Sequence, residues 1–150
     1  MTTPAPAEPA ASREQGPTKN RDPFLGLLIS YIQGDTGELP ITLAINGMLI
    51  SGRIISSHAY FDGMAETIAA SLFGNDESPT RAVLVESISS LPGDRNDPEI
   101  KEVDSLHFIH LRNVRFMDAA GQMLNLNGAP LWRGRLTEVA GWSFGAFEKS

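Results

Sequence analysis

The pentapeptide at residues 141–145 is a place where the residue types of this sequence match a catalytic motif. Gly141-Trp142-Ser143-Phe144-Gly145 has the Gly-x-Ser-x-Gly pattern of a hydrolase nucleophile. Such a serine lies between a strand and a following helix, and its acid and histidine come later in the chain. Only residues 146–150 follow, and none of them is histidine. The pattern therefore indicates an aromatic strand with a glycine bend rather than a catalytic serine.

The histidines do not have the spacing of a metal site. His107 and His110 are three positions apart in a segment that we expect to be a strand, where such residues point to opposite faces. The sequence has no cysteine, which excludes disulfides, thiol catalysis and thiolate metal ligands. It also has no glycine-rich phosphate-binding motif. We therefore expect a protein that is not an enzyme, with no catalytic residue, cofactor or metal.

Arginine and tryptophan residues in the last third of the chain form the candidate binding surface. Arg133 and Arg135 are two apart in an expected strand and so share a face. Arginine and tryptophan are enriched at the centres of binding sites, because they supply forked donors or large contact areas. The alternatives for this surface are internal pairing with the acidic loop, protein binding or self-association, and nucleic-acid binding. The candidate partner-binding residues are Arg112, Arg115, Trp132, Arg133, Arg135 and Trp142.

The overall composition is that of a globular protein with a single domain. The chain has 150 residues, of which 41% are hydrophobic and 20% charged. Its formal net charge of −6 argues against non-specific binding of nucleic acid. The apolar stretch from Phe24 to Ile29 is too short to span a bilayer and lies behind charged residues, unlike a signal peptide. We expect a cytoplasmic protein that does not contact membranes.

Two segments differ from the rest in composition. Residues 1–22 are rich in proline and alanine and have no large apolar residue after Met1, which predicts a disordered tail before a domain at residues 23–150. Residues 92–105 form an acidic loop, and the wider stretch from Asp76 to Asp104 holds eight acids against three basic residues. Such a charge run usually forms a solvated face.

Helical signals occur at the front and in the middle of the chain. Asp22 and Pro23 begin a helix over residues 23–33, which we expect to pack on or plug the rest of the domain. Ser57 begins a longer helix that ends at Gly74. Ser78-Pro79 begins another helix that ends near Ser90, for which a strand at Ala82 to Val85 is the alternative. In the helix expected at residues 23–33, the apolar stripe consists of Phe24, Leu27, Leu28 and Tyr31.

The remaining segments read as strands. Residues 41–45 alternate in hydropathy and lead through Asn46-Gly47, a hairpin turn signal, into a return strand at residues 48–55. Gly52 within that strand indicates a bulge or a close backbone approach. Further strands are expected at residues 106–117, 123–126, 131–139 and 142–147. These elements predict an α+β fold with a small, mostly antiparallel curled sheet or barrel of the Sm-like or SH3-like kind, an N-terminal helix and an inserted helical segment. An open α+β sandwich is the alternative.

Three sequence blocks keep their order along the expected strands. They are residues 45–56 (INGMLISGRIIS) with Tyr60-Phe61-Asp62, residues 107–113 (HFIHLRN), and residues 132–136 (WRGRL) with Glu138, Val139 and Gly141. Together these blocks resemble the gas vesicle protein U family, called GvpU. The resemblance covers close to half of the expected folded part.

The resemblance implies a small accessory protein of gas vesicles without catalytic chemistry. It implies clustering of gas vesicles through self-association and contact with the vesicle shell or other gas vesicle proteins. One alternative is a chaperone or assembly factor for shell subunits, which would bind soluble shell protein. A further alternative is an Sm-like RNA-binding module, which would form a ring and retain RNA in a salt-sensitive manner.

Overall fold

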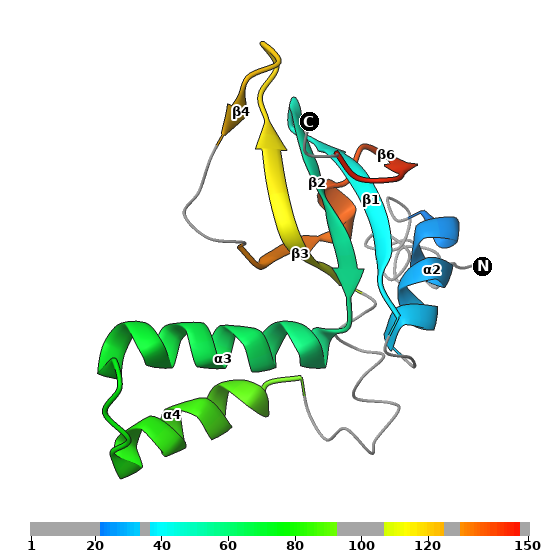
Figure 1. The fold of residues 1–150 in the computed structure, drawn as a ribbon. Helices are drawn as coiled ribbons and strands as arrows, with labels where there is room; N and C mark the ends of the chain where they lie inside the picture. The colour runs from blue at the N-terminus through cyan, green and yellow to red at the C-terminus, as the bar shows by residue number, and fades with distance from the viewer. Residues whose placement is uncertain (1–21, 34–36, 93–106, 125–129, 148–150) are drawn as a thin grey trace, which may run out of the picture.

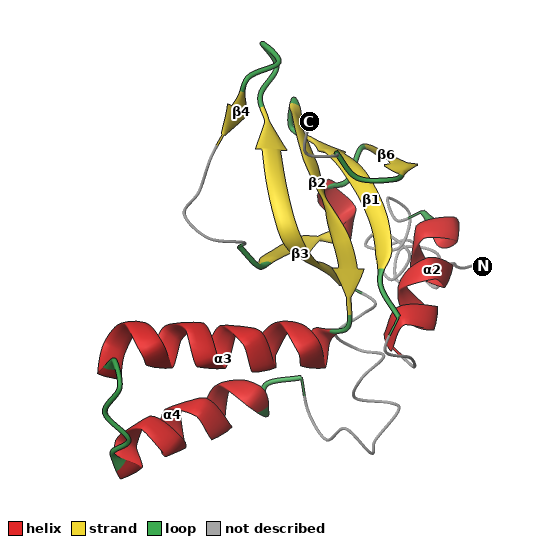
Figure 2. Cartoon of the chain, viewed as in Figure 1, coloured by secondary structure: helices red, strands yellow, loops and turns green. Residues whose placement is uncertain are grey.

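The computed structural model describes residues 22–33, 37–92, 107–124 and 130–147, where helices pack beside an antiparallel sheet (Figure 1, Figure 2). The expected α+β class, with an N-terminal helix and an inserted helical segment, is confirmed. Residues 1–21 of the expected tail and residues 93–105 of the acidic loop lie outside the described residues. The elements in chain order are α2 (Pro23–Gln33), β1 (Leu39–Ile45), β2 (Met48–Ile55), α3 (Ser57–Phe73), α4 (Pro79–Ser89), β3 (Phe108–Met117), β4 (Met123–Leu124), β5 (Trp132–Arg135), the 3-10 helix η1 (Leu136–Glu138) and β6 (Gly141–Phe144).

The sheet has six strands and is open. Four of its pairings give the order β4-β3-β2-β1-β6, and β5 also pairs with β3. Strand β3 is long enough for β5 to pair with its first half and β4 with its last two residues. All pairs are antiparallel. The curled sheet is therefore confirmed, and β4 and β6 do not close it into a barrel.

The hairpin and the bulge follow the local sequence. Asn46 and Gly47 both have positive φ, at 50° and 82°, as a two-residue turn between twisted strands requires. In the pairing of β2 with β3 the register shifts between Ser51 and Arg53, where β3 has one residue more than β2, so the bulge lies in β3 opposite Gly52. A Cβ atom at Gly52 would lie 2.9 Å from the carbonyl oxygen of Arg112. The close backbone approach expected at Gly52 is confirmed, whereas the bulge lies in the partner strand β3.

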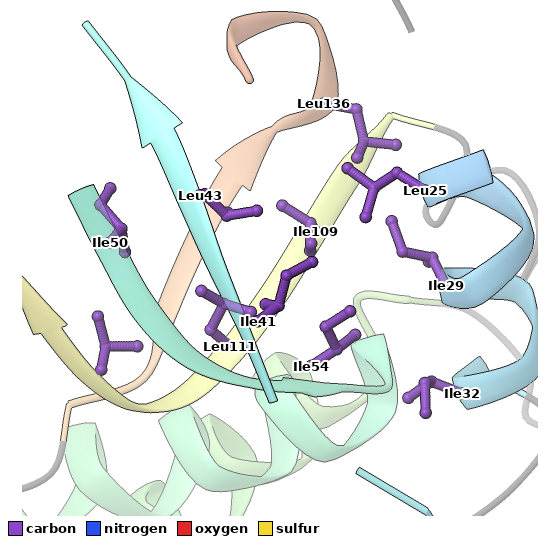
Figure 3. Close-up of a cluster of buried hydrophobic side chains, with 11 residues drawn as sticks. Leu25, Ile29, Ile32, Ile41, Leu43, Ile50, Ile54, Ile109, Leu111 and Leu136 are labelled. Carbon is purple, nitrogen blue, oxygen red and sulfur yellow. The ribbon is translucent and has the colours of Figure 1, made fainter. Parts of the chain in front are cut away.

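Helix α2 packs on the sheet through a different stripe from the one expected. Leu25, Ile29 and Ile32 are buried with the apolar side chains of the strands (Figure 3), whereas Leu27 is 53% and Tyr31 70% exposed. Helix α2 has no charged residue, so apolar positions recur around its whole circumference and hydrophobic spacing alone does not select the buried side. The other members of the core are Ile41, Leu43, Ile50, Ile54, Ile109, Leu111, Val114 and Leu136.

Helices α3 and α4 form a hairpin that leaves the lower end of the sheet (Figure 1). The N-terminal cap of α3 is Ser56, whose Oγ accepts a hydrogen bond of 3.0 Å from the Ala59 amide, so the expected cap at Ser57 was wrong by one residue. Ser57 is buried, and its amide and hydroxyl both donate to Oε1 of Gln33 in α2. Ser78 caps α4 as expected. No side chain of α4 is buried, so this helix depends on its contact with α3.

The C-terminal strands are shorter than expected. Strand β5 ends at Arg135, because Leu136 turns into the core and its amide donates to the carbonyl of His107. The Ala140 amide then donates to the carbonyl of Ala44, which places β6 beside β1 from Gly141 onward. None of the described helices has both the length and the apolar character needed to cross a bilayer.

Candidate binding surface

Strand register places five arginines on one face of the sheet. Arg53 is directly opposite Arg112, and residues opposed in this way point to the same face. Ser51 and Arg53 are two positions apart on β2 and so point to the same face, and Ser51 is opposite Arg115. His110 and Phe108 lie two and four residues before Arg112 on β3, so they point to the same face as Arg112. Arg133 is opposite His110 and Arg135 is opposite Phe108, which adds these two arginines to the face. We call this set the arginine face: Arg53, Arg112, Arg115, Arg133 and Arg135.

The arginine face contains four of the six residues that the sequence suggested. Trp132 and Trp142 lie on the other face, packed against the core. The Trp132 ring occupies the space above Gly134, where a Cβ would be 2.1 Å from an indole carbon. Trp142 meets the Phe24 ring edge-on at 5.1 Å, and its Nε1 donates to a carboxylate oxygen of Asp22. This hydrogen bond holds the Asp22 pKa below its usual value, assisted by the Phe24 amide.

Arg53 is the member of the arginine face that sequence reasoning missed. It lies in a strand dominated by isoleucine, whose alternation continues through Gly52 in the register with β1. The sequence signal was that Arg53 lies an odd number of residues from both Ile50 and Ile54, which face the core, so its side chain points to the other face. Its closeness to Arg112 depends on the pairing of β2 with β3, two segments more than 50 residues apart.

The positive charge of the described residues is concentrated on the arginine face. The described ranges contain six arginines and no lysine, and five of those arginines belong to this face. Arg112 forms an ion pair of 2.7 Å with Glu38, in which the two side chains are 48% and 26% exposed. Exposed pairs of this kind contribute only about 0–1 kcal/mol and are screened by salt. The sixth arginine, Arg81, is on α4.

Arg133 has a structural environment that distinguishes it from its neighbours on the face. Its Cζ lies 3.7 Å from the centroid of the Phe108 ring and 5.1 Å from that of Phe61. Its Nη1 is 2.6 Å from Nε2 of His110. A guanidinium can only donate, so Nε2 of His110 accepts this hydrogen bond. Arg133 thereby joins β5, β3 and the first turns of α3.

Tyr60 completes this cluster from α3. Its ring centroid is 4.8 Å from that of His110 and 5.0 Å from that of Phe61. Burial raises the pKa of the Tyr60 hydroxyl, and the nearby charge of Arg133 partly offsets this. The cluster is therefore an anchor for the α3–α4 hairpin, made of edge-on and tilted rings packed around one guanidinium.

The hollow beside β6 has the wrong lining for acid–base chemistry. It is open to solvent, has a volume of about 410 Å³, and its lining includes no ionisable side chain. Ser143 is in this lining, but it is a strand residue opposite Thr42 and not the centre of a strand-to-helix turn. Within the described ranges, no three His, Cys, Asp or Glu residues come together in a way that could hold a metal ion. The residues of the hollow are Thr42, Ala44, Leu49, Gly141, Trp142, Ser143 and Phe147.

The fold and this surface define a small α+β protein with an open antiparallel sheet and a basic sheet face. Residues 22–147 match the model of a family described as gas vesicle protein GvpU-like. The chain belongs to this GvpU-like family of gas vesicle proteins, which confirms the resemblance in its strand sequences. The family is not known for enzymatic activity. The search of curated proteins gave no significant match, and neither did the search of solved structures.

Proposed function

We propose that this protein is a cytoplasmic accessory protein that promotes the clustering of gas vesicles through its arginine face. The face would contact the vesicle shell or other gas vesicle proteins, and also other copies of the chain. The family supports the link to gas vesicles. The observation that carries the contact surface is the placement of Arg53, Arg112, Arg115, Arg133 and Arg135 on one sheet face.

Weak contacts are sufficient for such a role. An exposed arginine–carboxylate pair contributes about 0–1 kcal/mol, so a single contact between two proteins would be short-lived. Many copies on one vesicle act together, and the effective strength then greatly exceeds that of each pair. Clusters held in this way should loosen as the salt concentration rises, because exposed charges are screened beyond about 10 Å at 0.1 M ionic strength.

Exposed arginines of the face provide the test. In gas-vesicle-forming cells that lack the gene, we would express the wild type or the variant Arg53→Gln/Arg135→Gln and image the vesicles. The matched control is Thr137→Glu/Ala140→Glu, which lowers the formal net charge by the same two units at exposed positions outside the face. We expect dispersed vesicles with the glutamine variant and clusters with the wild type and the control. Unchanged clusters with the glutamine variant would contradict the proposal.

A second candidate function is assembly of the vesicle shell, and an apolar surface on α2 favours it. Phe24, Leu27 and Tyr31 are each more than half exposed on one side of this helix. Exposed apolar patches mark contacts with other proteins, and a chaperone for hydrophobic subunits would use one. Deletion of the gene separates the two functions. Loss of vesicles indicates assembly, whereas normal but dispersed vesicles indicate clustering.

A further inference from the structure

The α3–α4 hairpin carries charge of the opposite sign to the arginine face. Five of the nine acidic residues that the structure describes belong to it or to the turn between its helices, with Arg81 as the only described arginine or lysine there. Asp76 and Glu77 are both exposed in that turn, which is the tip of the hairpin. Leu72 and Val83, near the tip, are also largely exposed. The other acidic residues of the hairpin are Asp62, Glu66 and Glu86.

The acidic tip lies well beyond the reach of Arg133 in the same molecule. Phe61 contacts Arg133 at the base of α3, and the helix continues to Phe73 before the turn begins. At 1.5 Å per residue this stretch spans about 18 Å, several times the length of an ion pair. The hairpin also points away from the sheet (Figure 1). The tip therefore cannot pair with Arg133 of its own copy, and its charge is complementary to that of the arginine face of another copy.

We propose that the acidic tip of the hairpin in one copy docks on the arginine face of a second copy. The proposal rests on the proposed function, for which it names the partner of the arginine face. The two surfaces differ, so the contact is head-to-tail, and each copy has one surface of each kind. Contacts of this type extend into chains when their rotation does not close a ring. A chain of this kind would connect vesicles beyond the reach of a single pair.

Charge reversal on each side gives a direct test with the purified full-length chain. The face variant is Arg53→Glu/Arg135→Glu, and the tip variant is Asp76→Lys/Glu77→Lys. We expect each variant alone to weaken self-association at least about fivefold at low salt, as measured by sedimentation velocity. Glu138→Lys, an exposed reversal away from both surfaces, should leave association within about twofold of the wild type.

Mixing the two variants is the decisive measurement. The basic face of the tip variant can meet the acidic tip of the face variant, so the equimolar mixture should recover most of the wild-type association. A four-substitution variant that carries both reversals should recover it as well. Circular dichroism identifies any variant that fails to fold. Absence of self-association in the wild type, an unaffected tip variant, or a mixture that does not recover would each overturn the head-to-tail contact.

Vesicle imaging separates this inference from the function on which it rests. If both variants disperse vesicles and the mixture restores clusters, the proposed function and the head-to-tail contact are both supported. If only the face variant disperses them, the arginine face acts in clustering but its partner is not the hairpin tip. If neither variant disperses vesicles, the proposed function fails together with this contact.

Discussion

Nη1 of Arg133 lies 2.6 Å from Nε2 of His110, a ring that is only 1% exposed. The same guanidinium stacks on Phe108, so one side chain of the arginine face is part of the structure beneath it. Arg53 and Arg135, by contrast, are exposed. The arginines of this face therefore include one that anchors the α3–α4 hairpin and two, Arg53 and Arg135, that are exposed and have no such structural role in the described contacts.

Replacement of Arg133 should destabilise the fold more than replacement of Arg135. Arg133→Met removes the stacking on Phe108 and the hydrogen bond to His110, and we expect it to lower the free energy of unfolding by about 1–3 kcal/mol. Arg135→Met should change it by less than about 0.5 kcal/mol, since that side chain is exposed. Urea unfolding of both variants measures the difference. Equal effects would show that Arg133 is not an anchor.

Much of the fold was predictable because its signals are local. The turn at Asn46-Gly47 and the caps at Asp22 and Ser78 each depend on a few adjacent residues. The buried side of α2 was not predictable, because a helix that is apolar all round offers more than one stripe. Only the packing of Leu25 against the sheet selects it.

The candidate surface was predictable in composition but not in arrangement. Alternation on β5 correctly placed Arg133 and Arg135 on one face. The same alternation places Trp132 on the opposite face, where its indole ring packs against the core. Arg53 joins the face through the pairing of β2 with β3, and pairing between strands distant in sequence has no local signal.

Alanine at Gly52 should be costly, whereas alanine at Gly141 should not. A Cβ at Gly52 would lie 2.9 Å from a backbone oxygen of Arg112 and 3.3 Å from Cβ of Leu111, so the β2–β3 pairing must shift to admit it. We expect a loss of about 1–3 kcal/mol in the free energy of unfolding for Gly52→Ala. Gly141 has no atom within 4 Å of the added Cβ, and its variant should differ from the wild type by less than about 1 kcal/mol. Thermal unfolding of both variants tests this, and a harmless Gly52→Ala would contradict the close approach.

Truncation of two leucines in α2 should reveal which side of the helix is buried. Leu25 is 1% exposed, so Leu25→Ala should lower the free energy of unfolding by about 2–5 kcal/mol. Leu27 is mostly exposed, and alanine is a better helix former, so Leu27→Ala should cost less than about 1 kcal/mol. Urea titrations give both values. A larger loss at Leu27 would mean that the helix packs through the stripe that its spacing first suggested.

Ionisation of Tyr60 should weaken the attachment of α3 at high pH. Burial raises the pKa of this hydroxyl above its ordinary value of 10.0, so the folded state holds the proton more tightly than the unfolded state. This contribution to stability is fully present below pH 10.0 and is lost as the pH rises through the folded-state pKa. Tyr60→Phe removes the titrating group, so the wild type should lose more stability than this variant above about pH 10.

The measurement for Tyr60 is urea unfolding in steps from about pH 8 to about pH 11, compared between the wild type and the phenylalanine variant, because other groups titrate equally in both. Tyr31 is 70% exposed, and Tyr31→Phe is the matched control that should keep the wild-type pH dependence. If Tyr60→Phe follows the wild-type curve throughout, the hydroxyl is not held in the cluster with His110 and Arg133. A difference confined to the Tyr60 variant would locate the alkaline loss of stability at the base of the hairpin, where the inferred docking element is anchored to the sheet.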